Sequence, residues 1–70
     1  MKYLIILEPT DTGYSAYSPD IPGCVTTGAT KAETERNMRE AIEFHLAGLR
    51  EEGMELPQPG TEVAFIDVAA

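Results

Sequence analysis

The chain contains one histidine and one cysteine, the two side chains that most often serve as a general base and a nucleophile. His45 falls on the apolar stripe of a predicted helix, and the glutamates near it point to other faces. Cys24 opens a predicted strand without the cationic or histidine neighbour that activates a thiol. We therefore expect both residues to pack in the structure, and we expect no catalytic residues.

Metal and cofactor sites are not indicated either. Zinc needs several His or Cys ligands, and the chain has only one residue of each type. Gly23 and Gly28 match neither a P-loop nor a dinucleotide-binding fingerprint. The sequence therefore predicts a protein without a cofactor or a metal, and not an enzyme.

Size and charge narrow the class of partner. The 70 residues carry a formal net charge of −7 with only five Lys and Arg, whereas phosphate backbones are bound by clustered basic residues. An acidic surface suits a basic protein partner, although it can also serve solubility alone. With a single cysteine and an apolar run at residues 3–7 that is too short for a signal peptide or a span, we expect a soluble, cytoplasmic protein.

The elements predicted along the chain give an α+β fold of the order βββαβ. Strands are expected at residues 2–8, 14–18, 24–27 and 62–68, with a helix at 30–52. Short connections make the first three strands an antiparallel meander, and a helix this long can recross the sheet. A right-handed crossover then places the last strand beside the first. The prediction is a four-stranded mixed sheet of order 3-2-1-4 with one long helix on one face.

Both ends of the helix have recognisable signals. Thr30 and Glu33 have the spacing of a capping box, and Gly53 suits the position just after the last turn. Apolar residues recur at helical spacing between these ends and should face the sheet: Met38, Ala41, Ile42, His45, Leu46 and Leu49.

Strands one and four are apolar on both faces, which is typical of sheets that are covered on both sides. One helix covers only one side, so we expect something outside the chain to cover the other. The hypothesis is a homo-oligomer, a dimer or a tetramer. Its candidate contacts are Leu4 and Ile6 on the uncovered face and Phe44 on the outer side of the helix, although a lone exposed Phe often has no role.

A second candidate surface lies around the rigid turn after strand two. Tyr14 and Tyr17 point to opposite faces of that strand, so one of them should be exposed as interface tyrosines often are. With Asp20 and Ile21 on the turn, they form the hypothetical partner-binding patch. The alternative is that these tyrosines only cover the edge of the core.

The string Ser18-Pro19-Asp20-Ile21-Pro22-Gly23-Cys24, followed by Thr27-Gly28-Ala29-Thr30 and an acidic helix, resembles the HicB-like antitoxin family. The resemblance implies a truncated ribonuclease H arrangement. It also implies a protein that neutralises a small basic ribonuclease toxin of HicA type by covering its catalytic surface. Many members carry a C-terminal DNA-binding module. Here we expect one domain, residues 1–70, without such a module and without direct binding of nucleic acid.

Two alternatives remain open from the sequence. The chain could be an orphan module of the same fold that self-associates or binds a small ligand and has no toxin partner. It could also be a degenerate nuclease, but two-metal hydrolysis needs several converging carboxylates. The middle of strand one, residues 3–6, has no acid, and Asp67 with one helix Glu does not complete such a site.

Overall fold

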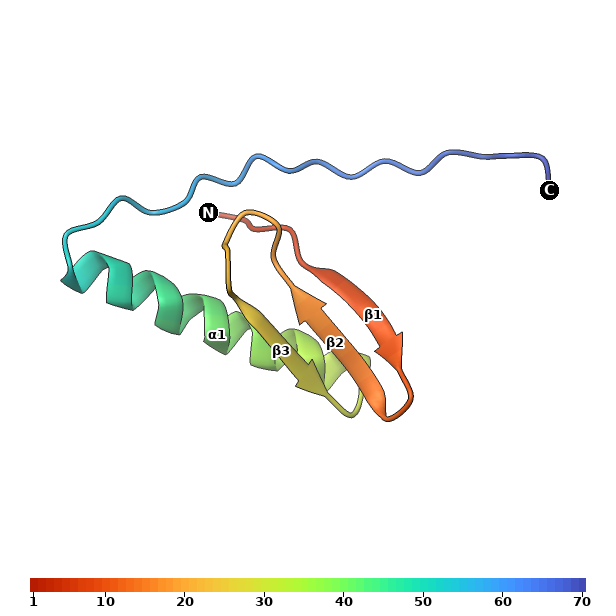
Figure 1. The fold of residues 1–70 in the computed structure, drawn as a ribbon, viewed down its shortest axis with the longest axis horizontal. Helices are drawn as coiled ribbons and strands as arrows, with labels where there is room; N and C mark the ends of the chain where they lie inside the picture. Colours follow the sequence, from red (N-terminus) through yellow and green to blue (C-terminus); the bar gives the residue numbers. More distant parts are fainter.

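The computed structural model describes all residues from 1 to 70 and contains three strands followed by one helix (Figure 1). The strands are β1 (Ile6–Thr10), β2 (Gly13–Tyr17) and β3 (Val25–Gly28), and the helix is α1 (Lys31–Glu51). The sheet lies on one side of the helix, so the α+β class and the βββα order of the prediction are confirmed.

The sheet is an antiparallel meander of order β1-β2-β3. β1 runs from Ile6, later than the predicted start, and includes Pro9 opposite Tyr14. Proline lacks an N–H and is tolerated on an edge strand, and β1 is an edge because it pairs only with β2. The edge of β1 therefore has no strand partner, and Pro9 leaves it without one donor N–H.

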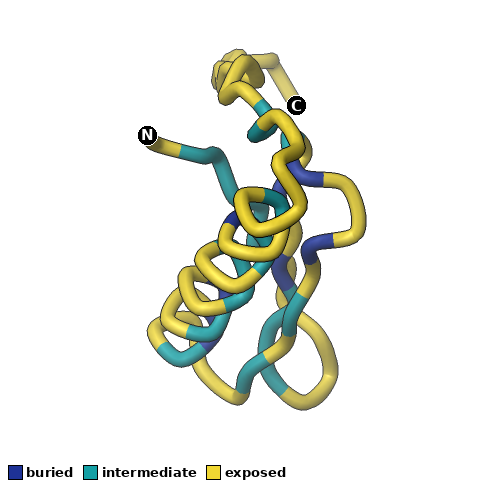
Figure 2. Tube along the Cα trace, turned by 90° about the vertical axis from the view of Figure 1, so that its left-hand side faces the viewer, coloured by how far each residue is buried: buried dark blue, intermediate teal, exposed yellow.

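The predicted fourth strand is wrong for the isolated chain. We call residues 54–70 the tail; it runs extended past the sheet, pairs with no strand, and is exposed over residues 58–70 (Figures 1 and 2). Two contacts with the body explain its path. The Tyr3 hydroxyl donates to the Pro57 carbonyl at 2.6 Å, and Asp20 accepts hydrogen bonds from Gly60 and Thr61. These contacts lead residues 62–68 outward rather than along β1.

The ends of α1 follow their sequence signals. Thr30 Oγ1 accepts the Glu33 N–H at 3.1 Å, and the Glu33 carboxylate accepts from the Ala29 N–H at 3.3 Å, one residue earlier than in the usual capping box. Gly53 has φ 69°, and its N–H reaches the carbonyl of Arg50 at 3.1 Å. The Met54 N–H also bonds the Leu49 carbonyl, at 2.9 Å, which completes a Schellman motif.

The core is small and lies between the sheet and α1. Seven of 70 residues are buried, so little apolar surface is fully withdrawn from water. At its centre are Ala16, Ile21, Cys24 and Met38, and packed against them are Tyr3, Ile5, Leu7, Ala41 and Ile42. Cys24 is therefore a packing residue, as the sequence predicts, and Ile21 is wholly inside.

The two edges of the sheet differ. At β3, the Asn37 side-chain amide of α1 donates to the Thr27 carbonyl at 3.0 Å. β3 is also only four residues long and ends at Gly28, where an added Cβ would lie 2.5 Å from Thr34 Oγ1. The helix thus closes over β3, whereas the edge of β1 has no such cover.

Candidate partner-binding surfaces

The face of the sheet that turns away from α1 carries an apolar row. Ile6 pairs with Tyr17, and Tyr17 pairs with Val25, so one side chain from each strand stands in line. Tyr17 is 42% exposed and Val25 is 62% exposed. We call Ile6, Tyr17 and Val25 the outer row; half-buried Leu4, two residues before Ile6, continues it along the chain.

The next row on the same face is polar. It consists of Glu8, Ser15 and Thr27, which are aligned by the same strand register. The outer face is therefore apolar toward the Pro19 turn and polar toward the β1–β2 hairpin. A surface of this kind, with aromatic and aliphatic groups beside polar ones, is typical of protein interfaces.

The predicted patch around the turn is split by the structure. Tyr17 stands on the outer face, whereas Tyr14 is half-buried on the opposite face of β2. Ile21 is 0% exposed and supports the turn from within the core, so it offers no surface to a partner. Of the four predicted residues, burial therefore removes only Ile21 from the surface, whereas Tyr17 is exposed and Tyr14 and Asp20 are half-buried.

Asp20 holds the tail. Its Oδ1 accepts the Thr61 hydroxyl at 2.7 Å, and its Oδ2 accepts the backbone N–H groups of Gly60 and Thr61, each at 3.3 Å. The Thr61 hydroxyl is the main reason why the pKa of the Asp20 carboxyl lies below its ordinary value; desolvation opposes this shift, and the two backbone N–H groups add to it. The carboxylate form is thus the form that holds the tail. No local pattern in the sequence indicates this contact, because Gly60 and Thr61 lie 40 and 41 residues from Asp20.

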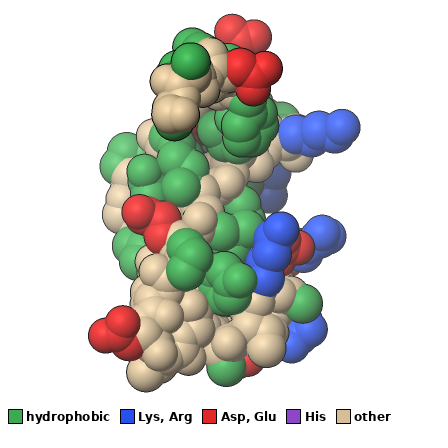
Figure 3. Space-filling view, turned by 90° about the vertical axis from the view of Figure 1, so that its right-hand side faces the viewer, with side chains coloured by type: hydrophobic (Ala, Val, Ile, Leu, Met, Phe, Trp, Pro, Cys, Tyr) green, Lys and Arg blue, Asp and Glu red, His purple; other side chains and the backbone are tan.

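A groove of about 540 Å³ runs between β1 and α1. Its sheet side is formed by alternate residues of the N-terminal stretch, and its helix side by the apolar stripe and charged residues beside it. Figure 3 shows hydrophobic side chains along the middle of the molecule, with Lys and Arg along one border. The lining residues are Met1, Tyr3, Ile5, Leu7, Glu35, Met38, Arg39, Ile42, Glu43, Leu46 and Arg50.

Other candidate residues lie apart from these surfaces. Phe44 is 83% exposed on α1, and His45 is half-buried. Burial raises the pKa of the Cys24 thiol, which disfavours the reactive thiolate. No group of three or more His, Cys, Asp or Glu side chains is arranged to hold a metal ion. α1 is too polar to cross a membrane, and it is the only helix.

Comparison with known proteins gives a consistent family. The family model described as "HicB_like antitoxin of bacterial toxin-antitoxin system" matches residues 3–68. An uncharacterized 14.9 kDa protein of Haemophilus phage HP1 is 43% identical over 67 residues, which is 96% of this chain and 50% of that protein. Antitoxin HicB 2 of Photorhabdus laumondii is 32% identical over 71 residues, 100% of this chain and 51% of the relative. The chain thus spans about half the length of both relatives.

A solved structure is also similar. A chain in the HicA3 and HicB3 toxin-antitoxin complex superposes with a TM-score of 0.72 at 38% sequence identity. The match covers 86% of this chain and 70% of that chain. At this identity the similarity extends beyond the fold to the sequence that builds it.

Proposed function

Since this chain belongs to the HicB-like antitoxin family, we propose that it is a non-catalytic interaction protein that binds and neutralises a small basic ribonuclease toxin of HicA type. The observation that carries the proposal is the similarity to a chain of the HicA3 and HicB3 complex, which covers 86% of the present chain. We further propose that residues 1–70 act as one domain in the cytoplasm.

The charge of the chain supports a basic protein partner. A net charge of −7 attracts a cationic toxin and accelerates encounter with it, and the same charge repels the RNA that the toxin cleaves. An inhibitor of this kind needs no chemistry of its own. It needs only to occupy the surface that the RNA would use.

The outer row is the candidate surface for the toxin. It combines an exposed tyrosine with aliphatic neighbours, and Asp20 lies on the turn that directly follows β2. Aromatic residues in such positions commonly dominate binding free energy. We propose that Tyr17 is the main contact, and that Tyr14 and Ile21 support the turn from the inner side.

We also propose that the chain self-associates. Ile6 lies on the uncovered side of β1 beside its free edge, Leu4 lies two residues before it in the stretch that leads into β1, and Phe44 is an exposed aromatic side chain on α1. Exposed apolar side chains that are covered in an oligomer gain roughly 25 cal/mol per Å² of buried area.

The test is to co-purify the chain with the basic protein encoded beside it and to measure RNA cleavage by that protein. We expect the chain to suppress cleavage and to leave RNA intact when incubated alone with Mg²⁺ or Mn²⁺. Tyr17→Ala should weaken toxin binding by about tenfold or more, as for a buried interface aromatic. Met54→Ala is the matched control, because Met54 is similarly exposed at 55% but lies in the tail.

Two results would contradict the proposal. One is a chain that leaves the activity of its basic neighbour unchanged, which would favour an orphan module of the same fold. The other is RNA cleavage by the chain itself that Asp67→Asn abolishes, which would indicate a nuclease.

A further inference from the structure

We propose that residues 62–68 of one chain form the fourth strand of a second copy, in the groove between that copy's β1 and α1, so that two chains exchange their tails. The inference rests on the proposed self-association and specifies its geometry. It is independent of toxin binding.

The receiving site has two complementary parts. β1 offers an edge without a strand partner, so its outward N–H and C=O groups can pair with an incoming strand. Next to that edge, the groove of about 540 Å³ exposes the sides of Ile5, Leu7 and Ile42. A strand added at the edge of β1 would place alternate side chains into this groove. This is the position that the sequence predicts for strand four.

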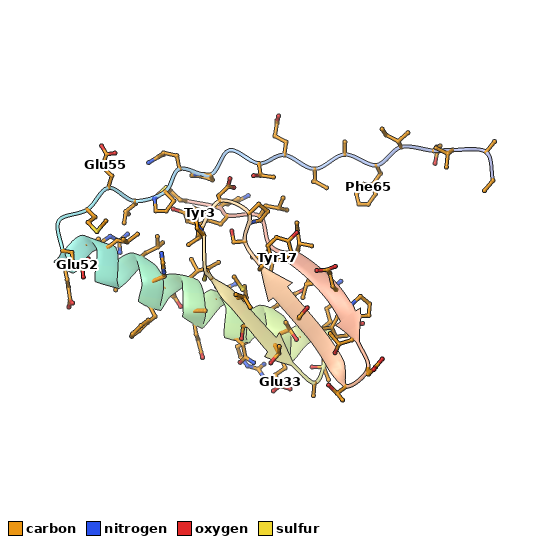
Figure 4. All side chains as sticks on the ribbon, in the orientation of Figure 1. Tyr3, Tyr17, Glu33, Glu52, Glu55 and Phe65 are labelled. Atoms are coloured by element: carbon orange, nitrogen blue, oxygen red, sulfur yellow. The ribbon has the colours of Figure 1, made fainter.

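The tail has the properties of the missing strand. Residues 62–68 alternate between two apolar sides: Val63 and Phe65 on one, and Ala64, Ile66 and Val68 on the other. The larger of these side chains are 65–95% exposed, with Phe65 at 95%. Figure 4 shows Phe65 projecting from the tail, far along the chain from the helix end at Glu52. Apolar residues on both sides of an extended segment indicate a strand that is to be covered on both faces.

The body of the chain directs this segment away from its own groove. Tyr3 fixes Pro57 above the start of the sheet, and Asp20 then fixes Gly60 and Thr61 at the turn between β2 and β3. With both contacts formed, the segment leaves the molecule past the sheet (Figure 1). The groove of a second copy can receive it without loss of either contact.

The lengths of donor and acceptor agree. One wall of the groove consists of Met1, Tyr3, Ile5 and Leu7, which span seven residues from the N-terminal stretch into β1, and the segment 62–68 also has seven. Each is about 23 Å long when fully extended, at roughly 3.3 Å per residue. The family model extends to residue 68, so it includes the whole segment. An added strand would also flank Leu4 and Ile6 on the outer side of β1, which are the proposed oligomer contacts.

The first experiment measures mass by analytical ultracentrifugation at micromolar concentration. The unaltered chain of 7.6 kDa should sediment as a dimer. Ala64→Pro removes one ladder N–H and should weaken the dimer by about tenfold or more, whereas the matched variant Ala64→Ser should remain dimeric. Because residue 64 is exposed and unpaired in the single chain, neither substitution should disturb the fold of the body.

The second experiment identifies the occupant of the groove. Isotope-filtered NOE spectra of a mixed sample of labelled and unlabelled chains should show contacts between chains, from one alternate set of tail side chains, either Val63 and Phe65 or Ile66 and Val68, to the methyls of Ile5 and Leu7. A monomer would overturn both the exchange and the proposed self-association. A dimer whose tail methyls contact only their own chain, or one that Ala64→Pro leaves intact, would overturn the exchange alone. Occupation of the groove by the toxin, with monomeric free chains, would also overturn it.

Discussion

The body, residues 1–53, and the tail of this molecule contain similar apolar residues, but these are packed in the body and exposed in the tail. In the body, Ile5, Leu7 and Met38 converge on the core. In the tail, Val63, Phe65 and Ile66 are as apolar but are 65–95% exposed, and the whole outer part of the tail is exposed (Figure 2). The difference does not come from composition. It comes from the presence of a packing surface, which α1 supplies to the first three strands and which nothing in the single chain supplies to residues 62–68.

This contrast shows that hydrophobic patterning specifies the need for burial but not the molecule that provides it. A two-sided apolar strand is compatible with pairing in its own chain and with pairing in another. Here two hydrogen-bonded contacts, at Tyr3 and at Asp20, decide the direction in which the segment leaves the body. A few polar atoms therefore determine which partner the apolar residues can reach.

The largest expected effect separates the two regions directly. Met38→Ala removes a wholly buried side chain and should lower the free energy of unfolding by about 2–5 kcal/mol. Phe65→Ala should leave the unfolding free energy of the monomer within about 0.5 kcal/mol, because that side chain is 95% exposed. Urea titration at a protein concentration below the dissociation constant of the dimer measures both changes in unfolding free energy. Equal losses would show that the tail packs on its own body.

A smaller effect is expected from two threonines. Thr30→Ala removes the N-cap of α1 and should destabilise the body by roughly 1 kcal/mol. Thr61→Ala removes the hydroxyl that donates a hydrogen bond to Asp20. Because this bond is exposed, the body should retain its stability while the tail loosens. Thermal unfolding reports the first change, and amide hydrogen exchange at residues 60–61 reports the second. A loss of body stability from Thr61→Ala would contradict the view that the body folds independently of the tail.

The smallest effect concerns pH. The folded-state pKa of Asp20 is lowered, chiefly by the Thr61 hydroxyl. The stability that the Asp20 carboxylate adds by holding the tail is therefore fully present above the pKa of Asp20 in the unfolded chain. The contribution is lost as pH falls through the lower folded-state pKa. The NMR chemical shift of the Thr61 amide proton should thus be constant near neutrality and change only below about pH 4. In Asp20→Asn this change should disappear, and its persistence would assign the transition to another group.

Local signals in the sequence predicted the body well. The Thr30 and Glu33 spacing located the start of α1, and Gly53 located its end, since both depend on groups within one turn of the helix. The meander followed from short connections, and the packing of Cys24 followed from the lack of a cationic or histidine neighbour that would activate its thiol. Each of these predictions needed only neighbouring residues.

Features that depend on distant residues were missed or misplaced. The apolar pattern of residues 62–68 and a right-handed crossover predict a fourth strand beside β1, but neither indicates the contact between Asp20 and Thr61. Ile21 was assigned to the exposed patch because it sits between two prolines in a turn, yet the turn folds its side chain into the core. The groove became visible only when β1 and α1 were in place.

The amide of Asn37 donates to the Thr27 carbonyl, so one acceptor at the β3 edge is already occupied and that edge is the less suited of the two to accept another strand. A molecule that offered both edges could add neighbours without limit and grow into a filament. One with a single acceptor edge and a single donor segment closes into a pair when two copies exchange segments with each other, and it continues as an open chain when each copy donates to a different one. Reciprocal exchange between two copies is therefore what limits the size of the assembly.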